Sequence, residues 1–133
     1  MTKYIIPLNP VTKKNSQRIV NIGGYPKIIP SKAYMKYLND SSYFFKRIKP
    51  VNHPVNLKCL YYMQTKRRVD LVNLLEATCD LLVTFGVLKD DNSSIVVSHD
   101  GSRVFYDKQS PRTEIYLEEI ADESIGNNGE RIV

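Results

Sequence analysis

The 133-residue sequence contains no apolar run that approaches the about 18 to 20 residues a membrane-spanning helix needs. Its first residues, Met1 to Pro7, form too short an apolar segment, broken too early by proline, to be a signal peptide. We therefore expect a protein without a membrane segment that acts in the cytoplasm. The sequence also lacks internal repeats.

Cysteine is scarce. Cys59 and Cys79 are the only two, and neither belongs to a CxxC pair or a Cys/His cluster. Both lie in apolar segments, which favours buried free thiols over a disulfide or a zinc site. The two histidines, His53 and His99, have no metal-ligand spacing either.

The length suits one domain with a real core, and the composition, 42% hydrophobic and 25% charged, is ordinary for a globular protein. Beyond Ile120 the residues turn to Asp, Glu, Ser, Asn and Gly. We predict a folded domain over residues 1–120 and a frayed polar tail over 121–133.

Positive charge is in excess: 19 Lys and Arg against 14 Asp and Glu give a net charge of +5. This excess favours an anionic partner. An anionic membrane surface is one possibility, but the basic residues are spread through several segments instead of lying on one amphipathic helix. Nucleic acid is therefore the leading candidate.

Apolar periodicity and turn residues predict the order of the elements. The predicted strands are 3–8, 55–64 and 112–119, the predicted helices are 32–49 and 70–85, and the predicted hairpins are 19–29 around Gly23-Gly24 and 94–106 around Asp100-Gly101. Ser31 is a suitable N-cap for the first helix and Gly86 a suitable C′ residue for the second.

The stretch from Lys66 to Asn92 joins a basic cluster, a short acidic helix and a pair of aspartates. A basic cluster, Lys66-Arg67-Arg68, precedes the second helix, and the pair Asp90-Asp91 follows it. Lysine and arginine side chains bind the phosphates of a polyanion, and carboxylates bind a divalent metal beside those phosphates. The alternatives are structural: Asp70 caps the helix, and Asp90 to Asn92 form a tight turn.

A helical wheel divides the second helix into two arcs. The apolar arc contains Leu71, Leu74, Leu75, Thr78, Leu82 and Phe85, and the opposite arc contains Asp70, Asn73, Glu76, Ala77 and Asp80. Asp70 and Asp80 are about 15 Å apart along the axis, so both cannot ligate one metal. We therefore expect Asp80 to have a structural role, such as pairing with a cation.

A second basic segment precedes the first predicted hairpin. It contains Lys13, Lys14, Asn15 and Arg18, and it is read equally well as a solvated loop and as an arm that contacts phosphates.

The sequences Asp70-Leu71-Val72-Asn73-Leu74 and Ala77 to Leu82, then Gly86 and Asp90-Asp91, resemble the motif of the RusA family of Holliday junction resolvases. Pro10 to Ser16 resembles the N-terminal part of the same family. The resemblance implies an α+β fold, a small mixed β-sheet packed with two main helices, and a homodimer. It also implies metal-dependent, symmetric cleavage of four-way junctions in branched DNA, with Mg²⁺ or Mn²⁺ held by aspartates.

Carried over by position, Asp70 and Asp91 match the metal-binding carboxylates of the family. Asp90 matches the other aspartate of the family's acidic pair, next to Asp91. Lys66, Arg67 and Arg68 match its basic cluster. We expect these cations, with Lys13, Lys14, Asn15 and Arg18, to contact DNA.

Two positions depart from the family motif: its second aspartate is Val72 here, and its lysine four residues later is Glu76. Because these positions are neighbours on the helix, Glu76 is predicted to reach toward Asp70 and restore the missing carboxylate. The predicted catalytic set is Asp70, Asp90, Asp91 and Glu76, and the predicted metal ligands are Asp70, Asp91 and Glu76. The alternatives are a DNA-binding protein that has lost cutting through Val72, and a general RNA-binding domain.

Overall fold

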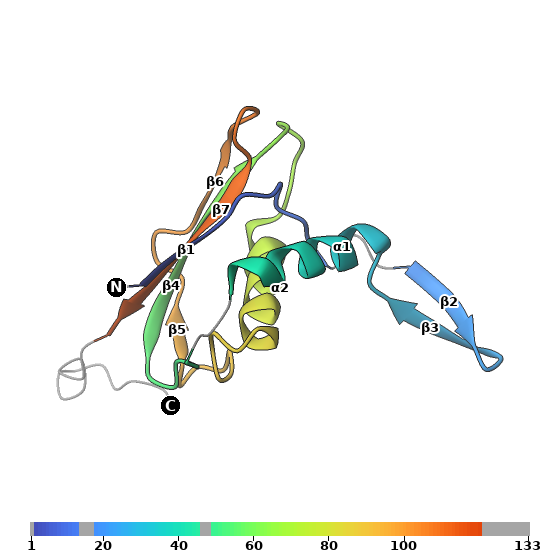
Figure 1. Cartoon of the computed structure of the whole chain (residues 1–133), viewed down its shortest axis with the longest axis horizontal. Helices are drawn as coiled ribbons and strands as arrows, with labels where there is room; N and C mark the ends of the chain where they lie inside the picture. The colour runs from blue at the N-terminus through green and yellow to red at the C-terminus, as the bar shows by residue number, and fades with distance from the viewer. Residues whose placement is uncertain (1, 14–17, 46–48, 121–133) are drawn as a thin grey trace.

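The structure, a computed structural model, describes residues 2–13, 18–45 and 49–120 (Figure 1). Its elements in chain order are β1 (Thr2–Ile6), β2 (Arg18–Ile22), β3 (Tyr25–Ile29), α1 (Lys32–Ser41), the 3-10 helix η2 (Ser42–Phe44), β4 (Val55–Met63), α2 (Leu71–Thr84), β5 (Val96–Ser98), β6 (Arg103–Tyr106) and β7 (Arg112–Glu119). The predicted tail over 121–133 lies outside the described residues, so the predicted domain boundary stays a prediction.

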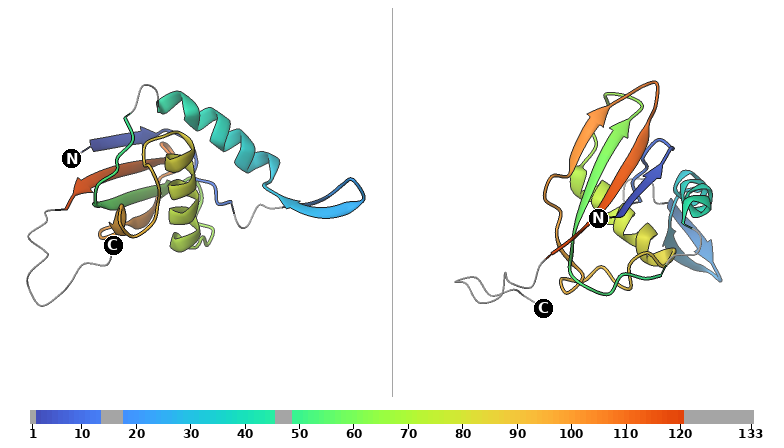
Figure 2. Two further views of the ribbon diagram at one scale, coloured as in Figure 1. Left: turned by 90° about the horizontal axis from the view of Figure 1, so that it is seen from below. Right: turned by 60° about the vertical axis from the view of Figure 1, so that its left-hand side comes forward.

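The main sheet has five strands in the order β1-β7-β4-β5, with β6 also paired to β4. The β1–β7 and β4–β7 pairs are antiparallel, whereas β5 and β6 run parallel to β4. Both helices lie on the same side of this sheet (Figure 2). The predicted α+β class, with a mixed sheet and two helices, is therefore confirmed.

The core lies between the sheet and α2. Strand β4 alternates as predicted: Val55, Leu57, Cys59 and Tyr61 are buried, while the residues between them are half-buried. The hydroxyl groups of Tyr61 and Thr78 share a hydrogen bond of 2.6 Å, which satisfies the phenol where α2 covers the strand. The two cysteines are free and buried, also as predicted.

Helix α1 begins as predicted, because the Ser31 side chain accepts a hydrogen bond from the Tyr34 N–H. The prediction that it runs to Lys49 is wrong: it ends at Ser41 and is followed by one 3-10 turn. Residues 39–42, Asn-Asp-Ser-Ser, have side chains that compete for backbone hydrogen bonds, and the Ser42 hydroxyl donates to the Asn39 carbonyl. Phe45 then enters the core against Phe85.

Helix α2 matches its prediction to within one residue at each end, and Gly86 follows it with a φ of 74°, as the C′ position requires. The predicted division into two arcs is wrong in part, because Asn73 and Ala77 are buried. Tyr34 of α1 lies close enough to Glu76 and Asp80 for both charges to raise the pKa of its phenol, after the larger effect of burial. This flank of α2 therefore faces α1 instead of solvent.

The second predicted hairpin is wrong. Strands β5 and β6 do not pair with each other; both run parallel to β4, one after the other along the same edge. Polar side chains in the segment between them make this possible, because they bond the β4 backbone where ladder bonds are missing. The His99 ring meets the Leu57 carbonyl, and the Ser102 hydroxyl accepts from the Cys59 N–H.

The first predicted hairpin is confirmed: β2 and β3 pair antiparallel around Gly23-Gly24. They form a separate two-stranded sheet that projects from the body of the molecule (Figure 1). Ile19 is 73% exposed and Ile28 is 66% exposed, so this hairpin is open to solvent. None of the described helices is long and apolar enough to cross a membrane.

Candidate functional site

The N-terminal end of α2 presents the basic cluster and Asp70 to solvent. Strand β4 ends at Met63, and Lys66, Arg67 and Arg68 are exposed in the loop that leads into the helix. Asp70 occupies the N-cap position, but its carboxylate makes no capping bond to the backbone; it accepts from the Asn73 side-chain amide at 3.3 Å. Asp70 therefore keeps exposed acceptor capacity for a ligand.

The C-terminal end of α2 leads into the acidic turn. Val87 and Leu88 are buried, and the Val51 backbone bonds Val87 and Lys89, which fixes the chain just before the turn. The Asp90 carboxylate accepts from the Asp91 N–H at 2.7 Å and from the Asn92 amide at 3.2 Å. Asp90 thus orders the turn, as its structural alternative predicts, and Asp91 remains exposed.

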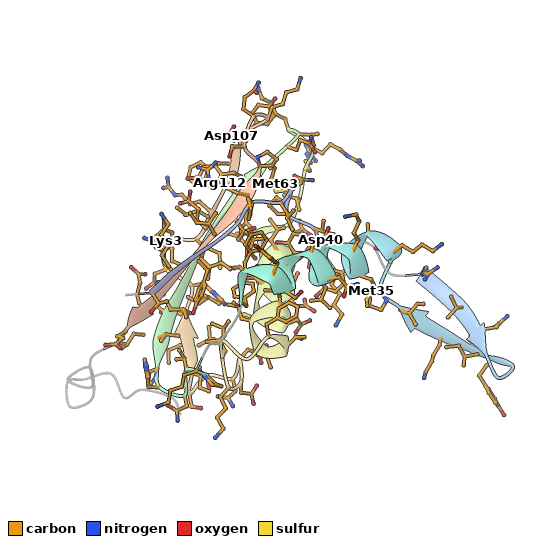
Figure 3. The ribbon with its side chains drawn as sticks, in the orientation of Figure 1. Lys3, Met35, Asp40, Met63, Asp107 and Arg112 are labelled. Carbon is orange, nitrogen blue, oxygen red and sulfur yellow. The ribbon has the colours of Figure 1, made fainter. Side chains whose placement is uncertain are left out.

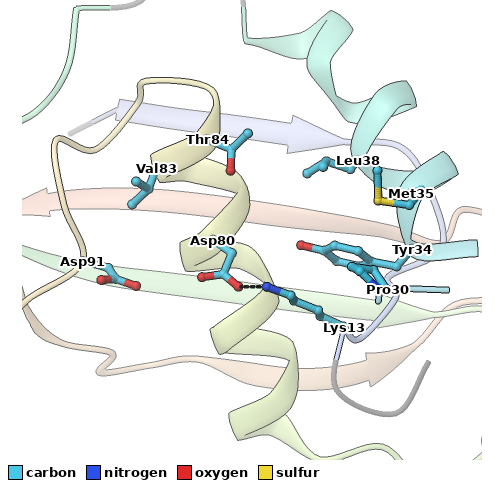
Figure 4. Close-up of a pocket in the computed structure, with 9 residues that line it drawn as sticks. All are labelled: Lys13, Pro30, Tyr34, Met35, Leu38, Asp80, Val83, Thr84 and Asp91. Atoms are coloured by element: carbon cyan, nitrogen blue, oxygen red, sulfur yellow. Dashed lines mark hydrogen bonds and ion pairs between the residues drawn. The ribbon is translucent and has the colours of Figure 1, made fainter. Parts of the chain in front are cut away.

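Asp91 and Asp80 line one pocket of about 380 Å³ (Figure 4). Lys13 enters it from the segment after β1, and its ammonium lies 3.2 Å from an Asp80 oxygen. The rest of the lining is largely apolar and comes from the residue before the N-cap of α1, from α1 and from the end of α2: Pro30, Tyr34, Met35, Leu38, Val83 and Thr84. The expectation that Asp80 pairs with a cation is confirmed, and the partner is Lys13.

The charges around this pocket act on its buried neighbours. Burial raises the pKa of the Cys79 thiol to about 12, with smaller contributions from Asp91 and then Asp80. Burial also raises the pKa of Tyr34, followed by the charges of Asp80 and Glu76. Glu76 is exposed and lies one turn before Asp80 on α2. Glu76, Asp80 and Asp91 therefore lie in the region of the pocket, but among the described residues they do not converge as a group that could hold a metal ion.

Asp70 lies away from this region. Ten residues of helix separate it from Asp80, which is about 15 Å along the axis. Among the described residues there is no group of three or more His, Cys, Asp or Glu side chains that could hold a metal ion. Val72 is 72% exposed, so the position where the family has an aspartate faces solvent. One chain thus offers carboxylates at two places.

The predicted DNA contacts are distributed likewise. Lys13 lies at the pocket and Arg18 is exposed at the start of the projecting hairpin, while Lys14 and Asn15 lie outside the described residues. The Lys66 ammonium lies 5.1 Å from the centre of the Tyr106 ring, which ties the basic loop to β6.

The shared pocket of Asp80 and Asp91 is the feature that the sequence did not predict. No spacing in the sequence relates Asp80, which lies within α2, to Asp91, which follows the end of the helix. The pocket forms because residues 85–91 return beside α2 (Figure 4), and the sequence alone does not show this return.

The fold and the site define a small α+β protein that presents exposed carboxylates beside a basic loop, a combination suited to phosphate chemistry. The model of one protein family, described as Endodeoxyribonuclease RusA, matches residues 7–118. The chain therefore belongs to the RusA endodeoxyribonuclease family, whose members are Holliday junction resolvases. No curated protein matches the chain.

Proposed function

We propose that this protein is a metal-dependent endonuclease that resolves four-way DNA junctions by paired phosphodiester cleavage, and that it acts in recombination and repair in the cytoplasm. The observation that carries the proposal is the exposed carboxylate of Asp70 directly after the exposed cluster Lys66 to Arg68, within a chain of the RusA family. The cations would hold DNA phosphates next to the carboxylate.

The carboxylates fit a hard divalent cation in chemistry, because Mg²⁺ and Mn²⁺ prefer oxygen ligands. Asp70, Asp91 and Glu76 are the residues proposed to hold it. When bound, such a metal lowers the pKa of an attacking water and neutralises charge on the phosphate. Asp90 would act by positioning Asp91, since its carboxylate accepts the Asp91 N–H.

The number of carboxylates at any one place in a chain is too small for this site, because no group of three forms among the described residues. We therefore propose that two copies of the chain form a homodimer and complete each other's sites, Asp70 coming from one copy and Asp91 from its partner copy. A dimer with two such sites would match the two symmetric cuts that resolve a four-way junction.

Phosphate binding would fall to the exposed cations. Lys66, Arg67 and Arg68 adjoin Asp70, and Arg18 extends the basic surface onto the hairpin. Lys13 is bound to Asp80, so its proposed contact with DNA would compete with that ion pair. Lys14 and Asn15 complete the proposed set of DNA contacts.

A junction-cleavage assay tests both parts of the proposal. Asp70→Asn and Asp91→Asn are each expected to abolish cleavage of a synthetic four-way junction in Mg²⁺ or Mn²⁺ while keeping junction binding. A mixture of the two variants is expected to regain cutting of one strand, because a mixed dimer contains one site with both carboxylates intact.

Asp40→Asn is the matched control, since Asp40 is an exposed carboxylate of α1 that pairs with Lys36. It is expected to cleave like the wild type. If the mixture stays inactive although mixed dimers are shown to form, the site lies within one chain and the shared-site proposal fails. If the wild type does not cleave with either metal, the nuclease proposal fails.

The second candidate function is a junction-binding protein on the same fold that no longer cuts DNA. Val72 favours it, because an exposed apolar side chain stands where the family motif has a carboxylate. Gel shift and strand cleavage on the same junction separate the two functions: binding without cleavage at any concentration of Mg²⁺ or Mn²⁺ identifies the second.

A further inference from the structure

Strand β6 exposes three consecutive apolar residues at the end of the sheet next to the basic loop. Val104 is 38% exposed, Phe105 is 37% exposed and Tyr106 is 46% exposed. Among the described strands β6 pairs only with β4, so its other edge is open. Together these side chains form an apolar patch around the open edge, with Val104 and Tyr106 on one face of the strand and Phe105 on the other.

Phe105 is the outer member of a stack that crosses the open face of the sheet. Its ring lies 4.9 Å from the Tyr62 ring, with the two planes 17° apart. On the other side of Tyr62, the Arg112 guanidinium lies 3.7 Å from the ring centre. Both faces of Tyr62 are therefore covered by strand neighbours, and the open end of the stack is the far face of Phe105.

The stack is held in place from the Arg112 side, where Asp107 lies beside Arg112 (Figure 3). Arg112 donates to Glu114 at 2.8 Å and to Asp107 at 3.0 Å. Asp107 also accepts the Gln109 and Ser110 N–H groups of the following turn, and these bonds, that from Arg112 first, lower the pKa of its carboxyl group. A surface ordered before binding loses less entropy when a ligand arrives.

The charge around the patch selects an anionic partner. Lys66 lies over the Tyr106 ring, and Arg67, Arg68 and Arg103 are exposed. None of these four cations forms an ion pair with another residue in the described part of the chain. The two acids beside the stack, Asp107 and Glu114, form ion pairs with Arg112. An exposed ring bordered by uncompensated cations is the arrangement that binds nucleotide bases and their phosphates.

We propose that Phe105 receives an unpaired or unstacked base at the branch point of the DNA, with Arg103 on the same face of β6 and the loop of Lys66 to Arg68 at the end of the strand on the adjoining phosphates. The proposal rests on the proposed function and adds to it the part of the substrate that the β6 edge recognises. A paired base inside a duplex has both faces covered by its neighbours. Only a branch point or a single strand offers a free base face to the open end of this stack.

The test uses the full chain without divalent metal and a four-way junction that carries 2-aminopurine at the branch point. Wild-type protein is expected to quench the fluorophore by stacking. Phe105→Leu, which keeps an apolar side chain and removes the ring, is expected to lose the quenching. Its affinity for the junction should fall roughly 5- to 150-fold, the range for one stacked base, with affinity for fully paired duplex unchanged.

Phe105→Tyr, which keeps the ring, is expected to restore the quenching. Val104→Ala is the matched control, because Val104 is equally exposed on the same strand but points to the opposite face. It is expected to bind and quench like the wild type.

Several results would overturn the proposal. One is a wild-type protein that binds the junction without quenching, and this readout does not depend on any variant folding. Others are equal losses for junction and duplex with Phe105→Leu, an equal loss with Val104→Ala, or a change of oligomeric state with Phe105→Leu, which would make the patch a protein interface. Failure of the nuclease proposal is separate, because it shows as binding and quenching without cleavage once metal is added.

Discussion

Val72 and Glu76 are the two residues at which this chain departs from the family motif in the proposed catalytic site. They lie one turn apart on α2, and Asp80 follows one turn later. In the structure the charges of Asp80 and Glu76 both raise the pKa of Tyr34, so the Glu76 carboxylate belongs to the flank of α2 that faces the pocket.

Restoring the family's carboxylate is the most direct test. Val72→Asp is expected to raise metal-dependent junction cleavage by about tenfold or more, corresponding to about 1.4 kcal/mol of transition-state stabilisation. The position is exposed, so the fold should tolerate the change. Initial rates over a Mg²⁺ titration measure the effect, and a rate equal to the wild type at every metal concentration would contradict it.

Glu76→Gln tests the relocated carboxylate. It removes a charge while keeping shape, and it is expected to lower cleavage by at least tenfold at limiting Mg²⁺, with partial recovery at high Mg²⁺. Unchanged cleavage at all metal concentrations would show that Glu76 does not replace the missing aspartate. Asp40→Asn again controls for the loss of an exposed carboxylate.

The two thiols should make the fold sensitive to alkali. Burial raises the pKa of Cys59 from 9.0 to about 12, and burial with the charges of Asp91 and Asp80 does the same for Cys79. Because the unfolded chain loses these protons first, their stabilising contribution is complete below about pH 9 and is lost as pH rises toward 12.

Urea unfolding between pH 8 and 10.5 measures this effect. The unfolding free energy of the wild type should fall more steeply with pH than that of a Cys59→Ala/Cys79→Ala variant, by up to about 1.4 kcal/mol per pH unit for each thiol. The comparison of slopes removes the constant cost of the smaller side chains. Parallel slopes would mean that the thiols titrate normally in the folded protein.

At the scale of elements, local patterns predicted those whose neighbours in sequence are also their neighbours in space. The β2–β3 hairpin follows from the two-glycine turn, and α2 follows from helical spacing. The 94–106 segment resembled a hairpin for the same local reason. Its pairing with β4 depends on side chains more than 40 positions away, such as the Asn56 amide oxygen that accepts from the Ser98 hydroxyl and the Asp100 N–H.

The same limit applies to the site. Asp70, Asp91 and the basic cluster could be singled out from the motif, and the helical rise correctly separated Asp70 from Asp80. That Asp80 lies beside Asp91 and Lys13 could not be predicted, because it depends on how the chain folds back before α1 and after α2. Burial of Asn73 and Ala77 likewise depends on tertiary packing that a helical wheel does not show.

The β2–β3 hairpin provides an element-scale prediction. An isolated two-stranded sheet is only marginally stable in water, and this one exposes Ile19 and Ile28 as a cross-strand pair. We expect it to pack against the second copy in the proposed homodimer. Ile19→Ser/Ile28→Ser should weaken dimerisation at least tenfold in sedimentation experiments, with little change in the melting of the main body.

Ile5→Ser is the control for that experiment, since Ile5 is an exposed isoleucine of β1 on the main sheet. It is expected to leave self-association unchanged. Equal dimerisation of the wild type and the hairpin double variant would place the dimer contact elsewhere.

At the scale of the whole molecule, the excess of positive charge favours the proposed DNA binding, and the number of phosphates that the cations neutralise sets its salt dependence. Replacing Lys66, Arg67 or Arg68 singly with Gln is expected to lower the slope of log K against log salt concentration by about 1. Lys36→Gln, whose ammonium is paired with Asp40, should leave the slope unchanged. Equal slopes for all variants would remove the basic loop from the phosphate contacts.

The division of one sheet edge into β5 and β6 has a consequence for colloidal behaviour. Long exposed edge strands recruit other chains into intermolecular sheets, and short interrupted ones do not. Here the edge is cut into three-residue and four-residue pieces by the bend at Asp100-Gly101. The chain can therefore leave Phe105 and Tyr106 uncovered for a ligand without offering a continuous template for aggregation.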